Sequence, residues 1–206
     1  INSDIVLKEF TLTARNKQYK AFLLFIDGMT DTNLVNDFVL KPLMLRNTAN
    51  SYDGNTVISE AVTNNITVRK VKKFDLKDYI LNCLLPQNNV KTQTEFKDIF
   101  YSVNAGNCAL FVDTLNLAFD IDVKGFQTRS ISKPENEVVI RGPQEAFVEN
   151  IRTNTSLIRR IVNNENLIIE NFKVGKVSQT ACVLCYMKNI ANDDLVAEAK
   201  YRLNNI

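Results

Sequence analysis

Arg141, Gly142 and Pro143 stand between a short apolar run and a helical pattern, at a turn where chemistry could occur. An anion can bind at such a turn, because free backbone N–H groups and a nearby arginine point at the helix start. A phosphate loop, however, needs several glycines and a lysine before Ser or Thr, and this turn lacks both. Glycine permits unusual backbone angles and proline fits the first helical position. The residues therefore favour a strand-to-helix joint, and an anion site held by Arg141 stays open as the alternative.

The chain contains no histidine, so it lacks the usual general base and the commonest metal ligand. Cys182 and Cys185 form a CxxC pair within ACVLCYM, an apolar run that predicts a strand. Residues three apart on a strand point to opposite faces, so these sulfurs should not converge on a metal. We expect these two cysteines, with Cys83 and Cys108, to be reduced and structural. We expect no metal site, no cofactor and no enzymatic activity.

The segment after Pro143 predicts a long helix. Glu145 and Glu149 would lie near its positive start, and Arg159 and Arg160 near its negative end, where each charge is favourable. The predicted apolar stripe consists of Phe147, Ile151, Ile158, Ile161 and Val162.

Polar residues interrupt the middle of that stripe at Asn154 and Thr155. Buried amides and hydroxyls cost roughly 1–3 kcal/mol unless they are hydrogen-bonded. We therefore expect this face to meet polar partners or water.

The composition is that of an ordinary globular protein, with 45% hydrophobic and 23% charged residues among 206. The net charge of +2 argues against nucleic acid as the main partner. The basic cluster from Arg69 to Lys73 predicts an exposed strand edge or loop, with an anionic membrane surface as the alternative. No apolar run approaches the ~20 residues that span a bilayer. Because the chain begins at Ile1, we expect it to be a fragment or a processed form.

Two segments of the chain resemble each other, one from Asp4 to Phe38 and the other from Asn166 to Ala199. Phe10 aligns with Phe172, and Asp31 aligns with Asn192. Each segment predicts a strand, a polar hairpin, a second strand, a short turn and a helix that begins behind an Asx cap. The shared order predicts a duplication. Because a helix precedes the second copy, we also expect a matching helix upstream of Ile1.

The region between the two copies predicts helices and then a hairpin. Asp75 should cap a helix that Pro86 ends, and Thr94 should cap another that Gly106 ends. The inward residues of the second of these helices should be Phe96, Ile99, Phe100 and Val103. The runs at 108–114 and 117–123 predict paired strands, 57–62 predicts a helix, and 86–89 and 130–137 predict loops.

Together these patterns predict a mixed α+β (α/β) fold of two small lobes, built from a duplicated β-β-α unit with flanking helices. Residues 1–133 would form the N-terminal lobe, including a helical and hairpin insert. Residues 134–206 would form the C-terminal lobe. We expect any membrane-spanning region to lie outside this chain.

The run VVIRGPQEAFVENIRTNTSLIRRI (138–161) resembles the signature segment of the A subunits of GerA-type bacterial spore germinant receptors. FIDGMTDTNLVNDFVLKPLM (25–44) and DVKGFQTRSI (122–131) are similar to other segments of that family. The resemblance implies a soluble N-terminal domain, followed in the full protein by a region in the spore inner membrane. It also implies B and C subunits as partners, association between A subunits, and a response to small nutrients. We take the domain to lie on the cytoplasmic side.

Two functions follow as expectations. In the first, the domain transmits a signal and contacts other subunits. The contacts between lobes or subunits would then come from Arg152, Thr153, Asn154, Thr155, Arg159 and Arg160. In the second, an amino acid, a sugar or an anion binds between the lobes near Arg141, Gly142, Pro143 and Glu145.

Overall fold

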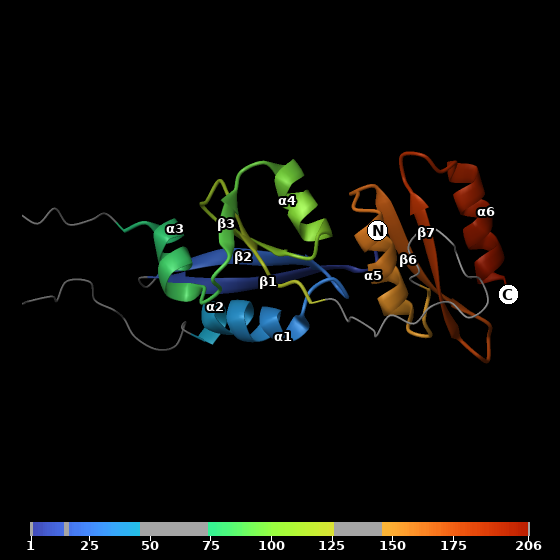
Figure 1. Ribbon diagram of the computed structural model, residues 1–206, viewed down its shortest axis with the longest axis horizontal. Helices are drawn as coiled ribbons and strands as arrows, with labels where there is room; N and C mark the ends of the chain where they lie inside the picture. Colours follow the sequence, from blue (N-terminus) through green and yellow to red (C-terminus); the bar gives the residue numbers. More distant parts are fainter. Residues whose placement is uncertain (1, 15–16, 46–73, 126–145, 206) are drawn as a thin grey trace, which may run out of the picture.

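The computed structural model describes residues 2–14, 17–45, 74–125 and 146–205. Its strands form a five-stranded sheet in the order β1-β2-β4-β5-β3 and a two-stranded sheet of β6 and β7, both antiparallel. Helices lie against both sheets, and the two sheets occupy different ends of the molecule (Figure 1). The predicted mixed α+β class is therefore confirmed.

The larger sheet is built from β1 (Ile5–Ala14), β2 (Lys17–Ile26), β3 (Val90–Gln93), β4 (Cys108–Val112) and β5 (Ala118–Ile121). In β2 the buried side chains alternate through Ala21, Leu23 and Phe25, as a strand with one face on a core requires. β4 and β5 pair with each other, which confirms the hairpin predicted for this part of the chain.

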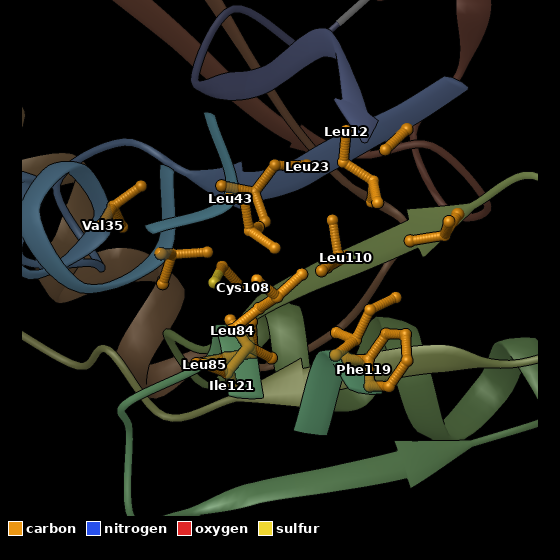
Figure 2. Close-up of a cluster of buried hydrophobic side chains, with 14 of the residues drawn as sticks. Leu12, Leu23, Val35, Leu43, Leu84, Leu85, Cys108, Leu110, Phe119 and Ile121 are labelled. Carbon is orange, nitrogen blue, oxygen red and sulfur yellow. The ribbon is translucent and has the colours of Figure 1, made fainter. Parts of the chain in front are cut away.

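One face of the larger sheet packs against a continuous helical segment formed by α1 (Thr32–Leu34), the wider-turned η1 (Val35–Leu40) and α2 (Lys41–Leu45). A second helical segment, α3 (Leu76–Tyr79) with η2 (Ile80–Leu84), packs on the same core. Figure 2 shows side chains from both helical segments meeting those of the sheet. The labelled core residues include Leu12, Leu23, Val35, Leu43, Leu84, Leu110 and Phe119.

The opposite face of the sheet is covered by α4 (Phe96–Asn104), through Ile99 and Val103. Figure 1 shows α4 across the sheet from α1 and α2. The prediction that Phe96 and Phe100 point inward is wrong, because both are exposed. Their rings instead lie 6.3 Å apart on the outer side of the helix.

The predicted cap of α3 is present, and that of α4 is not. Asp75 accepts a hydrogen bond from the Lys77 N–H (2.9 Å), as expected of an N-cap. The predicted cap at Thr94 is wrong, since Glu95 precedes α4 and makes no side-chain capping bond. The turn at Gly106 is confirmed, with φ of 99° and a bond from its N–H to the Val103 carbonyl (3.0 Å).

The smaller sheet consists of β6 (Leu167–Val174) and β7 (Thr180–Met187), preceded by α5 (Ile151–Ile161) and followed by α6 (Asp193–Asn204). In Figure 1 this hairpin runs between α5 and α6. Contacts join α5 to β7 and α6 to β6.

The register of the two hairpins supports the predicted duplication. Phe10 pairs with Ala21 in the first hairpin, and Phe172 pairs with Cys182 in the second. In each unit an Asx side chain then caps the following helix. Asp31 accepts from the Asn33 N–H at 2.8 Å, and Asn192 accepts from the Asp194 N–H at 2.8 Å. The repeated β-β-α unit is therefore present in the fold.

The first residues of the chain connect the two β-β-α units, the one that contains β1 and β2 and the one that contains β6 and β7. The Ser3 N–H donates to the Ile169 carbonyl (2.9 Å), and the Asn2 side chain accepts from the Ile169 N–H (2.7 Å). Residues 2 and 3 thus lie along the outer edge of β6 before the chain enters β1. No helix in the described ranges is long and apolar enough to cross a membrane.

Other expectations lie outside the described residues. These are the helix at 57–62, the basic cluster 69–73, the loop at 130–137 with its lobe boundary, and any helix before Ile1.

Candidate functional site

Helix α5 begins at Ile151 and is capped by Asn150, whose Oδ1 accepts from the N–H groups of Arg152 (2.9 Å) and Thr153 (3.3 Å). The predicted single long helix after Pro143 is therefore wrong where the structure describes it, because residues 146–150 are not helical. Asparagine is among the strongest N-cap residues, and it sets the start here. Glu149 consequently lies before the helix and not in its first turn.

Two residues of the polar Thr-Asn-Thr sequence, Asn154 and Thr155, bond through their side chains within their own segment. Asn154 donates to the Val148 carbonyl (2.6 Å) and accepts from the Val148 N–H (2.7 Å). Thr155, which is buried, donates to the Arg152 carbonyl (2.9 Å). The expectation that these groups need polar partners is confirmed, and Asn154 holds the chain that enters α5.

A buried ion pair joins the last turn of α5 to the chain before β1. The guanidinium of Arg159 donates through Nε and Nη2 to the two carboxylate oxygens of Asp4, the Nη2 contact being 2.8 Å. The side chains are only 3% and 11% exposed. Two-point pairing of this kind fixes orientation as well as distance.

An exposed ion pair joins the first turn of α5 to the turn after β2. Arg152 contacts Asp27 through Nη1, and the arginine side chain is 62% exposed. Gly28, with φ of 86°, follows Asp27, and a Cβ at this position would lie 3.0 Å from Cγ of Arg152. A side chain here would be strained and would press on Arg152, so glycine allows the close approach.

A polar cleft of about 400 Å³ lies between these two elements. The β2–α1 side contributes Asp27, Thr30 and Asp31, and the α5 side contributes Arg152, Thr153 and Ser156. The first N–H groups of both helices are already bonded to Asp31 and Asn150. Two carboxylates against one guanidinium therefore make the cleft unfavourable for an anion and suited to a neutral or cationic polar group.

A second polar cluster lies on the smaller sheet. Glu170 accepts from Lys200 and from the Tyr186 hydroxyl, both at 2.8 Å. The hydrogen bond from Lys200 lowers the pKa of Glu170, and the bond to Glu170 raises the pKa of Tyr186 and that of Lys200. This cluster attaches α6 to β6.

Two of the four cysteines, Cys108 and Cys185, lie in surroundings that disfavour the thiolate. Cys182 and Cys185 lie three apart on β7, as predicted, and no disulfide joins any of the four cysteines, all of which the structure describes. Burial raises the pKa of the Cys108 thiol and of the Cys185 thiol, which disfavours the reactive thiolate. Within the part of the chain that is described, no group of His, Cys, Asp or Glu residues could hold a metal ion.

The structure brings together only part of the predicted site. Arg152 and Thr153 line the cleft, Arg159 is buried against Asp4, and Arg160 is exposed at the end of α5. Asn154 and Thr155 bond within their own segment. Arg141, Gly142, Pro143 and Glu145 lie outside the described residues.

Sequence reasoning missed Asp4 and Asp27, the two acidic partners. Arg159 lies four residues after Thr155 and shares the buried side of α5 with it. The predicted apolar stripe did not include Arg159 and is wrong at Phe147 and Ile161, which are exposed. An arginine at an inward position requires an acidic partner. Nothing in the local pattern showed which of the 23 acidic residues that partner would be.

Comparison with known proteins gives a consistent result. A family model described as Bacillus/Clostridium GerA spore germination protein matches residues 1–206. Spore germination protein KA of Bacillus subtilis is 28% identical over 205 residues, covering 100% of this chain and 34% of that protein. Spore germination protein A1 of the same organism is 29% identical, covering 97% of this chain and 37% of that protein. The chain thus spans about a third of the length of these curated relatives.

The crystal structure of the N-terminal domain of the A subunit of the Bacillus megaterium spore germinant receptor GerK3 is also similar. The two chains are 27% identical and superpose with a TM-score of 0.63, covering 100% of this chain and 66% of that one.

Proposed function

Since the chain belongs to the Bacillus/Clostridium GerA spore germination protein family, we propose that it transmits a nutrient signal as the N-terminal domain of a germinant receptor A subunit. The full protein would act with B and C subunits in the spore inner membrane, and this domain would contact other subunits on the cytoplasmic side. The relatives named as spore germination proteins and the GerK3 A-subunit domain support this assignment. None of the four cysteines, all of which lie in the described ranges, forms a disulfide, which is compatible with a reducing compartment.

The observation that carries the proposal is the pair of ionic contacts between α5 and the first unit. Arg159 and Asp4 are buried, so breaking this contact is costly and it acts as a fixed point. Arg152 and Asp27 meet at the exposed rim of the cleft, where such a pair contributes about 0–1 kcal/mol. The rim contact can therefore break and form again while the buried contact holds, and this difference permits a small rotation between the units.

A charge swap at the rim tests this proposal in spores that carry the full-length receptor. Arg152→Glu and Asp27→Lys each place like charges together, so each should slow nutrient-triggered germination at unchanged receptor levels. The double variant restores opposite charges and should recover most of the rate. Arg202→Gln, on the exposed face of α6, is the matched control for loss of a surface ion pair.

Single variants that germinate at the wild-type rate, with receptor levels verified by immunoblot, would reject a role for the rim contact. Equal slowing in the single and double variants would show that the charges act separately and not as a pair.

A second candidate function is binding of a small nutrient in the cleft. Its volume of about 400 Å³ falls in the ~300–1,000 Å³ range of small-molecule sites. Asp27 and Asp31 can receive an ammonium group or sugar hydroxyls, and Thr153 and Ser156 offer further hydroxyls.

Titration of the isolated domain with amino acids and sugars, followed by NMR, tests this candidate. Binding should shift the amide signals of Asn33, Thr153 and Ser156 at millimolar ligand and leave those of β6 unchanged. A Ser156→Ala, Thr153→Val variant should weaken those shifts. Absence of clustered shifts for every ligand would exclude the cleft as the nutrient site.

A further inference from the structure

A small polar cavity of about 200 Å³ lies within the first unit, where α4 packs against β3 and β5 (Figure 1). It is separate from the cleft beside α5, because the two share no lining residue. Ser102 of α4, Asn107 of the turn that follows and Asp120 of β5 are among the residues that line it. Its volume is below the ~300–1,000 Å³ of sites for drug-sized ligands, so only a molecule of a few heavy atoms fits.

Asp120 is the buried acid of this cavity, with only 6% of its surface exposed. The Ser102 hydroxyl donates to Oδ2 and the Asn107 amide donates to Oδ1, both at 2.7 Å. A carboxylate has about four acceptor positions, so roughly two remain. No lysine or arginine in the described ranges forms an ion pair with Asp120. Its negative charge is therefore buried against neutral donors alone, which is unfavourable.

The side-chain oxygen of Asn107 is a second unmet acceptor. It is buried and has no hydrogen-bond partner among the described residues. It shares a carbon with the nitrogen that bonds Asp120, so it lies beside that carboxylate. The region thus lacks both a positive charge and N–H donors. A primary ammonium group supplies both, because it carries one charge and three donors.

The other charged residues of the cavity do not meet this need. Lys124 pairs with Asp122 at 3.9 Å. Lys91 lies opposite Asp120 in the pairing of β3 with β5, so the two side chains share a face, but Lys91 is exposed. Lys91 is therefore the competitor that a cationic ligand would have to displace. The exposed Tyr101 also lines the cavity, and its ring attracts cations.

A divalent metal ion matches the cavity less well than an ammonium group does. Mg²⁺ and Ca²⁺ take six or more oxygen ligands in a fixed shell. Within the ranges that the structure describes, no three His, Cys, Asp or Glu residues are grouped so as to hold a metal. An ammonium group needs only acceptors that lie side by side.

We propose that this cavity binds a small molecule through a protonated primary amine, which donates to the Asp120 carboxylate beside the Asn107 oxygen. The ligand class is that of primary ammonium compounds of a few heavy atoms. The site lies wholly within the first unit, so it is independent of the proposed signalling role and of nutrient binding in the cleft.

An NMR titration of the chain of residues 1–206 at pH 7 tests the proposal, with ethanolamine as the probe. Millimolar ethanolamine, which is protonated at this pH, should shift the amide signals of Ser102, Asn107 and Asp120. Ethylene glycol carries a hydroxyl in place of the ammonium, and tetramethylammonium carries the charge without an N–H donor. Each should give less than roughly a tenth of the ethanolamine shift, because the site requires charge and donors together.

Two variants should change the affinity for ethanolamine in opposite directions. Asp120→Asn removes the charge and keeps the shape, so it should weaken binding roughly tenfold or more. Lys91→Met removes the competing cation and should strengthen binding roughly two- to threefold. Asp98→Asn removes an exposed carboxylate from the same helix, outside the cavity, and is the matched control that should leave binding unchanged.

Equal shifts with tetramethylammonium would overturn the proposal, since they would show attraction of any cation. Displacement of ethanolamine by millimolar MgCl₂ would overturn it in favour of a metal site. Shifts confined to Asn33, Thr153 and Ser156 would place the amine in the cleft instead. If Asp120→Asn does not fold, Lys91→Met decides, because unchanged or weaker binding in that variant would contradict competition at Asp120.

Discussion

The Arg159–Asp4 pair is the residue-scale feature on which the joint between the units depends. A charge removed from water is costly, and only close pairing with good hydrogen bonds offsets that cost. The two-point contact and the low exposure of both side chains meet this requirement. Losing one partner would leave the other charge shielded from water and unpaired.

Arg159→Met should therefore destabilise the domain by about 3 kcal/mol, measured as the free energy of unfolding in urea. The double variant Arg159→Met, Asp4→Leu replaces both charges with apolar groups and should recover most of that loss. Arg202→Gln removes an exposed pair and should cost under about 0.5 kcal/mol. If Arg159→Met lowers the free energy of unfolding no more than Arg202→Gln does, the buried pair does not hold the two units together.

The sequence indicated one half of this pair and not the other. The helical pattern placed Arg159 at the negative end of the helix and among the residues expected to make contacts between lobes or subunits, which is a local property of the chain. Asp4 lies 155 residues away, and its position depends on how the two units pack. Periodicity carries no information about packing between units.

At the scale of elements, the caps decide where helices begin. Asn150 and Asn154 together fix the entry to α5, the first by capping its N–H groups and the second by holding Val148. The sequence pattern predicted one helix from Pro143 onward, whereas α5 begins at Ile151 behind the Asn150 cap. The duplicated unit, by contrast, was predictable, since its strands and Asx caps repeat locally.

Asn150→Ala should lower the free energy of unfolding by about 1 kcal/mol, because two N–H groups lose their acceptor. Asn150→Asp keeps a capping oxygen and should retain most of the stability. Thermal unfolding followed by circular dichroism compares the two. An equal loss of stability in both variants would show that the stabilisation comes from the amide group of Asn150 and not from a capping oxygen.

The Glu170–Lys200 contact should make the attachment of α6 depend on pH. The hydrogen bond from Lys200 lowers the pKa of Glu170 below its ordinary value of 4.5. Its contribution to stability is thus present above pH 4.5 and is lost as the pH falls through the lowered pKa. The pKa of Lys200 is raised above 10.5, so its contribution is lost only as the pH rises through that raised value.

Urea unfolding of the wild type and of Lys200→Met, measured from pH 7 down to pH 3, checks this dependence. The difference in stability between them should be constant near neutrality and should shrink at the acidic end. A constant difference down to pH 3 would contradict the linkage.

At the scale of the whole molecule, Asn2 and Ser3 form one of the contacts that attach the first unit to the small sheet. Asn2→Ala removes the side chain that bonds the Ile169 N–H and the Leu167 carbonyl. The expected cost is about 1–2 kcal/mol, with faster hydrogen exchange at Ile169 and unchanged exchange in β4. Unchanged exchange at Ile169 would show that the backbone contact of Ser3 alone holds this attachment.

Residues 2–14 form one extended stretch of chain that begins on β6 and continues as β1. Such a stretch resists elongation, because hydrogen bonds to β6 hold its first residues and the pairing of β1 with β2 holds the rest. We expect a rotation of the small sheet to reach the large sheet through this stretch of chain. The stretch that contains the first strand therefore couples the two ends of the molecule mechanically.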